Sequence, residues 1–572
     1  MKNLSFLLFA LVSLALCSCN SKTAIQGHAD SLDQILVNQV GYFPNSNKVA
    51  LLRIKTEAFN VVDTATGKVV FTGKPSQLEY WELSGDSVAT ADFSELTTPG
   101  TYRICLNDNS ICSQAFSINN SVYTNIAKAS LKALYLNRSG MEITKEFGGE
   151  WAHAAGHPDT MVLVHASAAT KKRPEGYKLS SPGGWYDAGD YNKYIVNSGI
   201  STYTLLLFCQ MYPEYTKSLN ANIPESGNAI PDVLDELLYN LRWMLTMQDP
   251  NDGGVYHKLT NLAFGGFEMP DKATEPRFVV LKSTAASLDF AATMAMASRV
   301  LAKSDVPEIV ELGKECLDKA QKAYAWAKAN PAIYYKNPSD VSTGAYDDSN
   351  IKDEFFWATS ELALATNDFS TLSDKDLNDQ DKVVQSWGSV SMLGTLSLAI
   401  SENSAYKVEA QKVLVDFANQ LVEKSNGSPY RVSLDIFNWG SNSDVANMGV
   451  IKMVAYQITS DKKYLNSAQT DIDYLLGRNA TGYCFVTGFG GKQVMNIHHR
   501  PSGADGVAAP YPGFLSGGPN IVVLTDCPDV TRSTFPAKSF VDQECSYSTN
   551  EIAINWNAPL FFLLGAMDSM KK

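Results

Sequence analysis

The periodicity of the apolar residues changes once along the chain, near residue 120. Residues 34–118 alternate apolar and polar side chains with a period of two, and clusters of Pro, Asn, Thr and Gly separate the short runs. This spacing predicts a small antiparallel β-sandwich of immunoglobulin-like type. From about Ser121 onward the apolar residues recur at i, i+4 and i+7, which is the period of a helix. We therefore expect a multidomain chain, with a β-sandwich over 34–118 and an all-α domain over 119–572.

The all-α domain contains about eleven helical segments between Val122 and Met567, joined by long loops rich in Gly, Pro and Asn. The segments 285–300 and 552–567 are apolar on nearly every side, as the inner helices of a two-layer barrel would be. Pro559 lies inside the last segment and is expected to kink or interrupt it.

Composition narrows the class of partner. The sequence has 47 Lys and Arg against 60 Asp and Glu, a net charge of −13, and it contains no basic block. This balance argues against a nucleic-acid partner. Aromatic residues make up 10% of the chain, and an acidic protein rich in aromatic side chains suits sugar ligands. We expect a monomer.

The N-terminal segment has the features of an export signal. Lys2 precedes an apolar run from Leu4 to Leu16, which at about 13 residues is too short to span a bilayer as a helix. The sequence Leu16-Cys17-Ser18-Cys19 resembles a bacterial lipobox. The alternative is ordinary cleavage and secretion.

Lipidation at Cys19 would make residues 1–18 a lipoprotein signal peptide and residues 19–33 a polar tether. The lipid would be the only membrane attachment, because no other segment approaches a membrane span. Asn20 rather than Asp follows the cysteine, which favours the outer membrane of a bacterial cell envelope. Orientation toward the cell surface or the periplasm stays open.

The remaining cysteines suggest one disulfide. Cys105 and Cys112 flank an Asn- and Asp-rich turn between two short β-type runs, so they can face each other across a hairpin. The alternative is a pair of buried thiols. Three other cysteines stand in apolar surroundings and are expected to be inert core residues: Cys209, Cys316 and Cys484.

Two carboxylates stand three residues apart in a loop rich in Gly and aromatic residues. Asp187 and Asp190 lie within the segment 183–191, just before an apolar helical run. On a first helical turn both carboxylates would project to one side, which would suit a shared catalytic task. The alternative is helix capping, for which one Asp is enough.

Glu551 stands at the mouth of the almost wholly apolar last helix. A carboxyl group held there loses solvation, which raises its pKa and keeps it protonated as a general acid. The alternative is a glutamate favoured by the helix dipole. The loop around Asp187 and Asp190 is more polar, so we expect those two carboxyls to titrate at lower pH.

His498 and Arg500 follow the Gly-rich segment 488–491. A neutral imidazole and a guanidinium in a loop can bind sugar hydroxyls, whereas a two-histidine metal site would need further ligands that are not found nearby. Together with the Asp pair and Glu551, these residues indicate two-carboxylate hydrolysis of a glycosidic bond.

The C-terminal part carries a specific signature with fixed spacing: Phe540, Asp542, Tyr547, Glu551, Ala553, Asn557 and Ala558. By this signature the chain resembles glycoside hydrolase family 9, the endoglucanase family with an (α/α)6 barrel and, in one subgroup, a leading immunoglobulin-like module. The resemblance covers about 450 residues, including the stretches around Trp357, Trp387 and Trp439.

The resemblance implies roles for individual residues. Asp190 corresponds to the general base that activates water, Asp187 to the partner carboxylate that helps to hold that water, and Glu551 to the general acid. Inversion at the anomeric carbon then follows. The implied substrate-binding residues are His498, Arg500, Tyr547, Trp357 and Trp439.

One departure from the family concerns metal. Relatives with this leading module often carry a structural zinc whose ligands include two cysteines, but the corresponding segments here, 137–140 and 156–157, contain none. His153, His157 and His165 stand nearby, yet without soft thiolate ligands we expect no zinc and no other cofactor. A structural calcium stays open.

The leading hypothesis is an inverting endo-β-1,4-glucanase that acts on cellulose-like, mixed-linkage or xyloglucan backbones. One alternative is an exo-acting β-glucosidase or glucosaminidase of the same family. The other is a glycan-binding lipoprotein without activity, which the presence of all three carboxylates disfavours. The sequence ends soon after the last helix, so we expect no appended carbohydrate-binding module and action on soluble or loosened glucans.

Overall fold

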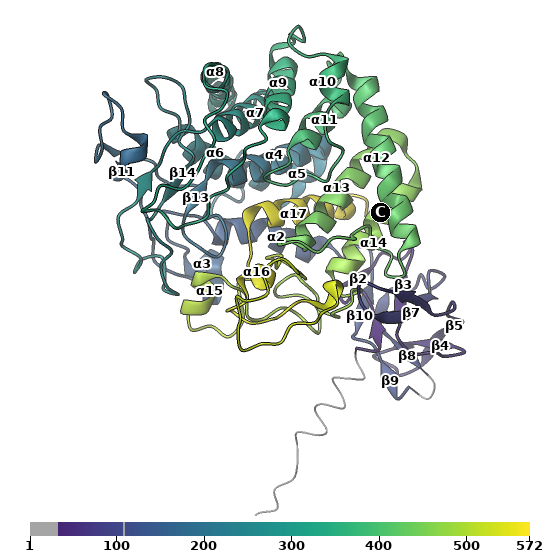
Figure 1. Ribbon diagram of the computed structural model, residues 1–572. Coiled ribbons are helices and arrows are strands. Elements are labelled where there is room, and N and C mark those ends of the chain that lie inside the picture. Colours follow the sequence, from purple (N-terminus) through teal and green to yellow (C-terminus); the bar gives the residue numbers. More distant parts are fainter. Residues whose placement is uncertain (1–32, 107–108, 572) are drawn as a thin grey trace, which may run out of the picture.

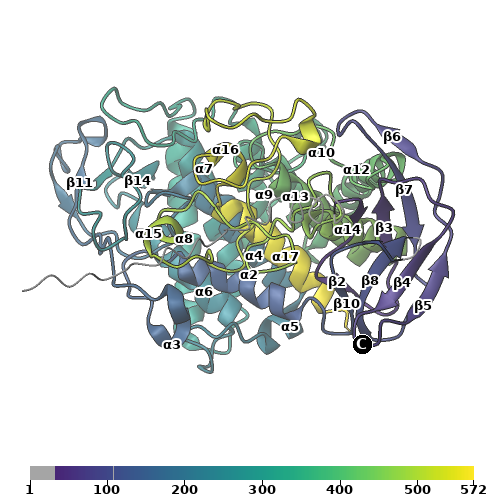
Figure 2. The same cartoon turned by 90° about the horizontal axis from the view of Figure 1, so that it is seen from below.

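The computed structural model describes residues 33–106 and 109–571. The predicted signal peptide, Cys19 and all but the last residue of the predicted tether lie outside the described residues. A β-rich domain lies beside a larger helical domain, on the side of helices α12 and α14, and two views at right angles agree on this placement (Figure 1, Figure 2).

The β-rich domain is a sandwich of two sheets, as predicted. One sheet has the order β1-β3-β7-β6, and the other has the order β2-β10-β8-β4-β5 with β9 paired to β8. Phe59, Phe93 and Phe116 lie in the core between them. The strands are β1 (Ile35–Leu36), β2 (Gly41–Tyr42), β3 (Val49–Leu52), β4 (Phe59–Asp63), β5 (Val69–Gly73), β6 (Glu79–Trp81), β7 (Asp86–Asp92), β8 (Gly100–Leu106), β9 (Ile111–Cys112) and β10 (Phe116–Ile118).

The cysteines confirm the hairpin prediction. Cys105 of β8 and Cys112 of β9 are direct cross-strand partners and form a disulfide. A second disulfide, for which the sequence offered no pairing, joins Cys527 and Cys545. The three cysteines expected in the core are free thiols whose pKa burial raises to about 12: Cys209, Cys316 and Cys484.

The helical domain is an (α/α)6 barrel, which confirms the predicted fold class. The inner ring consists of α4 (Ile195–Met211), α7 (Thr284–Leu301), α9 (Lys352–Thr366), α11 (Ser391–Ile400), α13 (Ser441–Thr459) and α17 (Ile554–Asp568). The outer ring consists of α2 (Thr124–Leu136), α6 (Asp232–Thr246), α8 (Pro307–Ala329), α10 (Asp374–Asn378), α12 (Lys407–Gly427) and α14 (Lys462–Leu475). Short helices in the connections are α3 (Lys145–Gly148), α5 (Pro213–Ser218), α15 (Arg500–Ala504) and α16 (Tyr547–Asn550).

The apolar pattern explains the two rings. Every residue of α17 is buried, whereas the buried residues of α12 recur along one face only. A helix that is apolar all round has to be enclosed, and an amphipathic helix can cover it. Pro559 does not interrupt α17, which runs unbroken from Ile554 to Asp568.

A third sheet, not predicted from the sequence, crosses the connections at one end of the barrel. Its order is β12-β11-β15-β14-β13. The strands are β11 (Val162–Val164), β12 (Lys178–Leu179), β13 (Lys193–Tyr194), β14 (Lys258–Thr260) and β15 (Phe278–Val279). Strands of two or three residues are too short to show a period of two, so sequence patterning could not reveal them.

The sandwich is fixed to the barrel through Asp86. Its carboxylate accepts a hydrogen bond from the Tyr430 hydroxyl at 2.9 Å and forms ion pairs with Arg53 at 3.1 Å and Lys538 at 2.5 Å. The ring of Trp81 lies 4.7 Å from that of Tyr430, centre to centre. Within the described residues, no helix combines the length and the apolar character needed to cross a membrane.

Candidate active site

The catalytic candidates meet at the end of the barrel where inner helices begin. Helix α4 begins five residues after Asp190, α9 begins six residues after Tyr346, and α17 begins three residues after Glu551. The loops before these three helices therefore share one face.

The segment from Asp187 to Asn192 is a loop and not the first turn of a helix, which corrects the sequence prediction. β13 separates this loop from α4. The loop is also bound by the C-terminal part of the chain, because the Asp187 carbonyl accepts a hydrogen bond from the Ile554 amide at 2.9 Å. The two carboxylates are thus positioned by separate contacts rather than by helical spacing.

The side chain of Asp187, the first residue of this loop, is buried. Its Oδ1 accepts a hydrogen bond from Asn197 Nδ2 at 2.6 Å, and its Oδ2 accepts one from the Tyr346 hydroxyl at 2.6 Å. Burial, and then repulsion by Asp190, raises the pKa of Asp187 to about 8. This corrects the expectation that both Asp residues titrate at lower pH, since the sequence does not reveal how deeply Asp187 lies.

Asp190 keeps a set of donors suited to an ionised carboxylate. Its Oδ2 accepts hydrogen bonds from the Asn192 side-chain amide and from the Tyr194 hydroxyl, the latter at 3.3 Å. Asn192 is itself fixed, because its Oδ1 accepts from Thr260 Oγ1 at 3.1 Å and from the Asn261 amide at 2.9 Å.

Glu551 reaches this loop from the other end of the chain. It lies between α16 and α17, and its Oε1 accepts a hydrogen bond from the Gly189 amide at 3.3 Å. Burial raises the pKa of Glu551 well above its ordinary value, and repulsion by Asp190 and Asp187 adds to this shift. The direction agrees with the expectation from the apolar helix, and it favours a protonated carboxyl group.

Gly189 is the point where three segments meet. A Cβ at this position would lie 2.2 Å from the His498 carbonyl oxygen, so a larger residue would push the segments apart. The Gly189 carbonyl accepts a hydrogen bond from Arg500 Nη1 at 2.7 Å. The His498 amide donates to the Asn550 carbonyl at 2.9 Å, next to Glu551.

A row of rings borders the site. His498 Nδ1–H donates to the Glu544 carbonyl at 2.7 Å, which leaves Nε2 free to accept, and burial lowers the pKa of the imidazole. The Tyr547 ring lies 5.8 Å from His498 and 5.3 Å from Trp439, centre to centre. Trp439 is 44% exposed.

Trp357 does not belong to this row, which corrects its predicted role. Its side chain is 0% exposed inside the barrel and packs edge-on against Tyr203 at 5.4 Å. A residue enclosed between inner helices cannot contact a polysaccharide. Trp387 is half-buried and lies 5.1 Å from Tyr346, on the Asp187 side of the site.

Sequence reasoning missed the residues that orient the carboxylates. Asn192, Tyr194 and Asn197 follow Asp190 closely, so a search for polar residues at the start of α4 would have found them. Tyr346 lies 159 residues from Asp187, and no local pattern marks it. Lys258 is buried on β14, donates to the Gly344 carbonyl at 2.7 Å, and has a pKa that burial lowers to about 7.

The segments that would hold zinc do lie side by side. The Gly140 amide donates to the Gly156 carbonyl at 2.9 Å. A Cβ at Gly156 would lie 2.2 Å from the Pro270 carbonyl oxygen, so no cysteine fits there, and Ser139 stands in the other thiolate position. The residues present do not fit a zinc site, and no group of three His, Cys, Asp or Glu placed to bind metal occurs in the described part of the chain.

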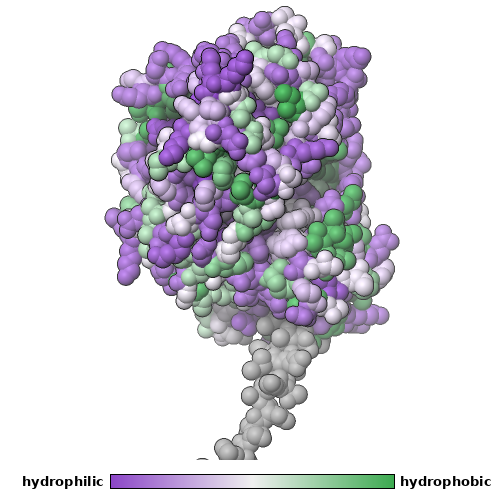
Figure 3. All heavy atoms as spheres, turned by 60° about the vertical axis from the view of Figure 1, so that its left-hand side comes forward, coloured by the Kyte–Doolittle hydropathy of each residue, from purple (hydrophilic) through white to green (hydrophobic). Residues whose placement is uncertain are grey.

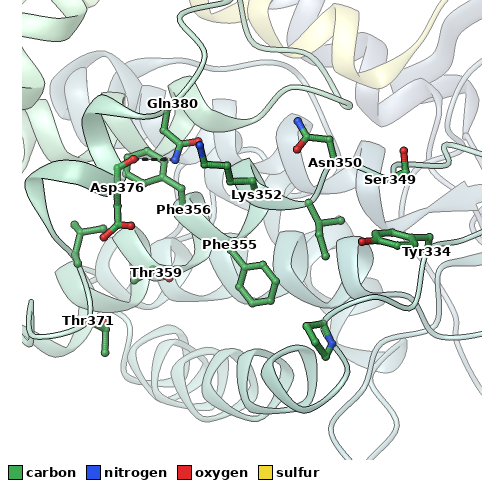
Figure 4. Close-up of a pocket in the computed structure, with 13 residues that line it drawn as sticks. Tyr334, Ser349, Asn350, Lys352, Phe355, Phe356, Thr359, Thr371, Asp376 and Gln380 are labelled. Carbon is green, nitrogen blue, oxygen red and sulfur yellow. Dashed lines mark hydrogen bonds between the residues drawn. The ribbon is translucent and has the colours of Figure 1, made fainter.

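A separate groove of about 490 Å³ is lined by the segment after α8, by the start of α9 and the residues before it, and by residues in and around α10. Figure 4 shows Tyr334, Phe355 and Lys352 along it, and Gln380 Nε2 donating to the Asp376 carbonyl at 2.8 Å. The Asp376 carboxylate caps α10 through Ser373. The groove therefore offers no free acid–base pair, and the site at the helix N-termini stays the candidate.

Taken together, the site holds a buried carboxyl group that favours its proton, a carboxylate with hydrogen-bond donors, and a row of rings. A protonated carboxyl group as the acid and a carboxylate as the base are what hydrolysis of a glycosidic bond requires.

Comparisons with known proteins match both domains of the chain. A sequence model of glycosyl hydrolase family 9 matches residues 123–564, and one of a cellulase N-terminal ig-like domain matches residues 30–110. A xyloglucan-specific endo-beta-1,4-glucanase of Bacteroides ovatus is 40% identical over 593 residues, covering 98% of each chain. Endoglucanase D of Acetivibrio thermocellus is 34% identical over 544 residues, covering 93% of this chain and 83% of its own.

Solved structures of proteins of this kind are similar to the chain over most of its length. The structure of a Bacteroides ovatus GH9 protein has a TM-score of 0.86 at 40% identity, covering 94% of this chain and 100% of its own. A thermostable endoglucanase from Alicyclobacillus acidocaldarius has a TM-score of 0.84 at 29% identity, covering 94% of this chain and 99% of its own.

Proposed function

This chain belongs to glycosyl hydrolase family 9, and we propose that it is an inverting endo-β-1,4-glucanase of β-glucan backbones. The observation that carries the proposal is the hydrogen bond from the Gly189 amide to Glu551 Oε1. It places the group that favours its proton beside the loop that bears Asp190.

The proposed mechanism assigns one step to each carboxyl group. Glu551 gives its proton to the glycosidic oxygen as the bond to the anomeric carbon breaks. Asp190 takes a proton from the water whose oxygen attacks that carbon from the opposite face, and Asp187 helps to hold this water. The new bond forms on the face opposite the leaving group, so the configuration inverts.

His498, Arg500, Tyr547 and Trp439 are proposed to bind the sugars. The free Nε2 of His498 can accept from a sugar hydroxyl, and the exposed face of Trp439 suits an apolar sugar face. Because the Bacteroides ovatus relative is named for xyloglucan, a branched glucan belongs among the substrates to be tested.

One experiment separates the proposal from its alternatives. The purified protein is incubated with carboxymethylcellulose, mixed-linkage glucan and xyloglucan, and the products are sized. Scattered oligosaccharides support endo action, glucose alone would show exo action, and binding without cleavage would show a dead site. Proton NMR of the first product tests inversion, since an initial β-anomer would exclude it.

We also propose that Cys19 is lipidated and anchors the protein in the outer membrane of a bacterial envelope. The support is the Leu16-Cys17-Ser18-Cys19 sequence, which lies outside the described residues. Cys19→Ala should move the protein from the detergent phase to the aqueous phase, and unchanged partitioning would refute the anchor.

Elemental analysis should find no stoichiometric zinc, and the same measurement decides the question of calcium.

A further inference from the structure

Two phenylalanine side chains near the site are exposed to solvent. Phe264 is 51% exposed and Phe267 is 38% exposed. In the described part of the chain, only one other phenylalanine, Phe535, is comparably exposed. The surface is mostly hydrophilic with a few apolar patches, as Figure 3 shows for one face. Exposed aromatic rings cost stability, and grouped ones commonly mark a binding surface.

The loop between β14 and β15 that carries these rings is tied to the catalytic loop. The Gly265 carbonyl accepts hydrogen bonds from Arg500 Nε at 3.1 Å and Nη2 at 3.0 Å. The Glu268 carbonyl accepts from the hydroxyl of Tyr191, the neighbour of Asp190, at 2.5 Å. The backbone on both sides of Phe267 is therefore held by Arg500 and by the residue next to Asp190.

Phe267 extends the row of rings described above. Its ring meets the His498 imidazole edge-on at 5.1 Å, and the Tyr547 ring also meets His498 edge-on, at 5.8 Å between centres. The Arg500 guanidinium carbon lies 5.8 Å from the centre of the Phe267 ring and 5.6 Å from that of Phe264. Trp439, Tyr547, His498 and Phe267 thus follow one another ring to ring, and Phe264 lies with Phe267 against the Arg500 guanidinium.

Part of Phe267 has a structural task. At Gly503 of α15, a Cβ would lie 2.5 Å from Phe267 Cδ1, so α15 leaves room for one side of this ring. The rest of the Phe267 ring and about half of Phe264 are not covered by other residues of the protein. Contact with the Arg500 guanidinium does not explain this exposure, because the rings could cover Arg500 without also facing solvent.

We propose that Phe264 and Phe267 form a further sugar-binding subsite at the Arg500 end of the cleft, where a pyranose ring stacks its apolar face on them. This inference rests on the proposed function. It predicts that the two rings bind only chains long enough to extend past His498 and Arg500.

The test compares Phe264→Ala and Phe267→Ala with Phe535→Ala as the matched control. Phe535 is 40% exposed but packs over Gly85 of the sandwich, away from the catalytic loop. For each variant, KM and kcat are measured on cellohexaose and on cellobiosyl fluoride. Binding of cellohexaose is measured by calorimetry in the inactive Glu551→Gln background, and thermal unfolding is followed in parallel.

Each of the two variants should weaken cellohexaose binding and raise its KM by about tenfold, with kcat on cellobiosyl fluoride within a factor of two. Phe264→Trp should retain binding. Equal losses on both substrates, a loss shared by Phe535→Ala, or unchanged hexaose binding would overturn the subsite. A wild-type protein that neither binds nor cleaves any glucan would instead overturn the proposed function.

Discussion

The backbone amide of Gly189 donates a hydrogen bond to the side chain of Glu551 across 362 residues of sequence. The carbonyl of the same glycine accepts from Arg500. One residue without a side chain therefore brings together the loop before α4, the start of α15 and the segment before α17. The spacing of acid and base depends on this contact and not on any single helix.

Asp190→Ala should lower turnover by roughly 10² to 10⁴, the usual contribution of general acid–base catalysis, with little change in KM. Steady-state kinetics on a soluble β-glucan measure both. Asn192→Ala is the matched control, because it removes a donor to Asp190 and keeps the carboxylate. It should cost less, and a turnover near the wild-type value in Asp190→Ala would remove Asp190 from the mechanism.

Asp187→Asn should move the alkaline limb of the pH–rate profile to lower pH. Repulsion by Asp187 is one of the causes that raise the pKa of Glu551. Removing that negative charge makes ionisation of Glu551 easier, so its pKa falls and the general acid loses its proton earlier. A profile of kcat/KM against pH measures the shift, and an alkaline limb that stays in place would contradict the coupling.

Lys258→Met should move the acidic limb to higher pH. Lys258 is a buried cation that donates to Asn337, Thr343 and Gly344, and its charge lowers the pKa of the Asp187 carboxyl. Without it, protonation of Asp187 sets in at higher pH. Thr343→Val removes a hydrogen bond and keeps the charge, so its acidic limb should not move. Thermal unfolding distinguishes an electrostatic effect from loss of the fold.

Asp86→Ala should reduce the free energy of unfolding by about 1–3 kcal/mol, because Arg53, Lys538 and Tyr430 lose their shared partner. Activity should fall with it, since Trp81 lies 6.2 Å from Phe437, two residues before Trp439. Urea unfolding and kinetics measure the two effects. Asp63→Ala, which affects only a turn of the sandwich, should leave activity unchanged. A similar loss in both variants would contradict an effect through the domain interface.

Much of the fold is predictable from periodicity, because the order of apolar residues follows the alternate burial over Thr101–Ile104 of β8 and the complete burial of α17. The site is less predictable. Asp187 and Asp190 were expected on a helical turn, but β13 stands between their loop and α4, and a strand of two residues leaves no pattern. Trp357 is an aromatic residue in a stretch similar to the family, and only its place on the enclosed helix α9 shows that it serves packing.

Glu551→Gln should abolish cleavage of ordinary β-glucans, whose sugar leaving group needs a proton. The glutamine keeps the shape of the side chain and an oxygen that can accept from the Gly189 amide, so the loops stay together. Activity on an activated substrate such as a glycosyl fluoride should be largely spared, because fluoride departs with less acid assistance. The alkaline limb should also disappear on that substrate, since it reports deprotonation of Glu551. Equal losses on both substrates, or an alkaline limb that persists in the variant, would show that another group supplies the proton.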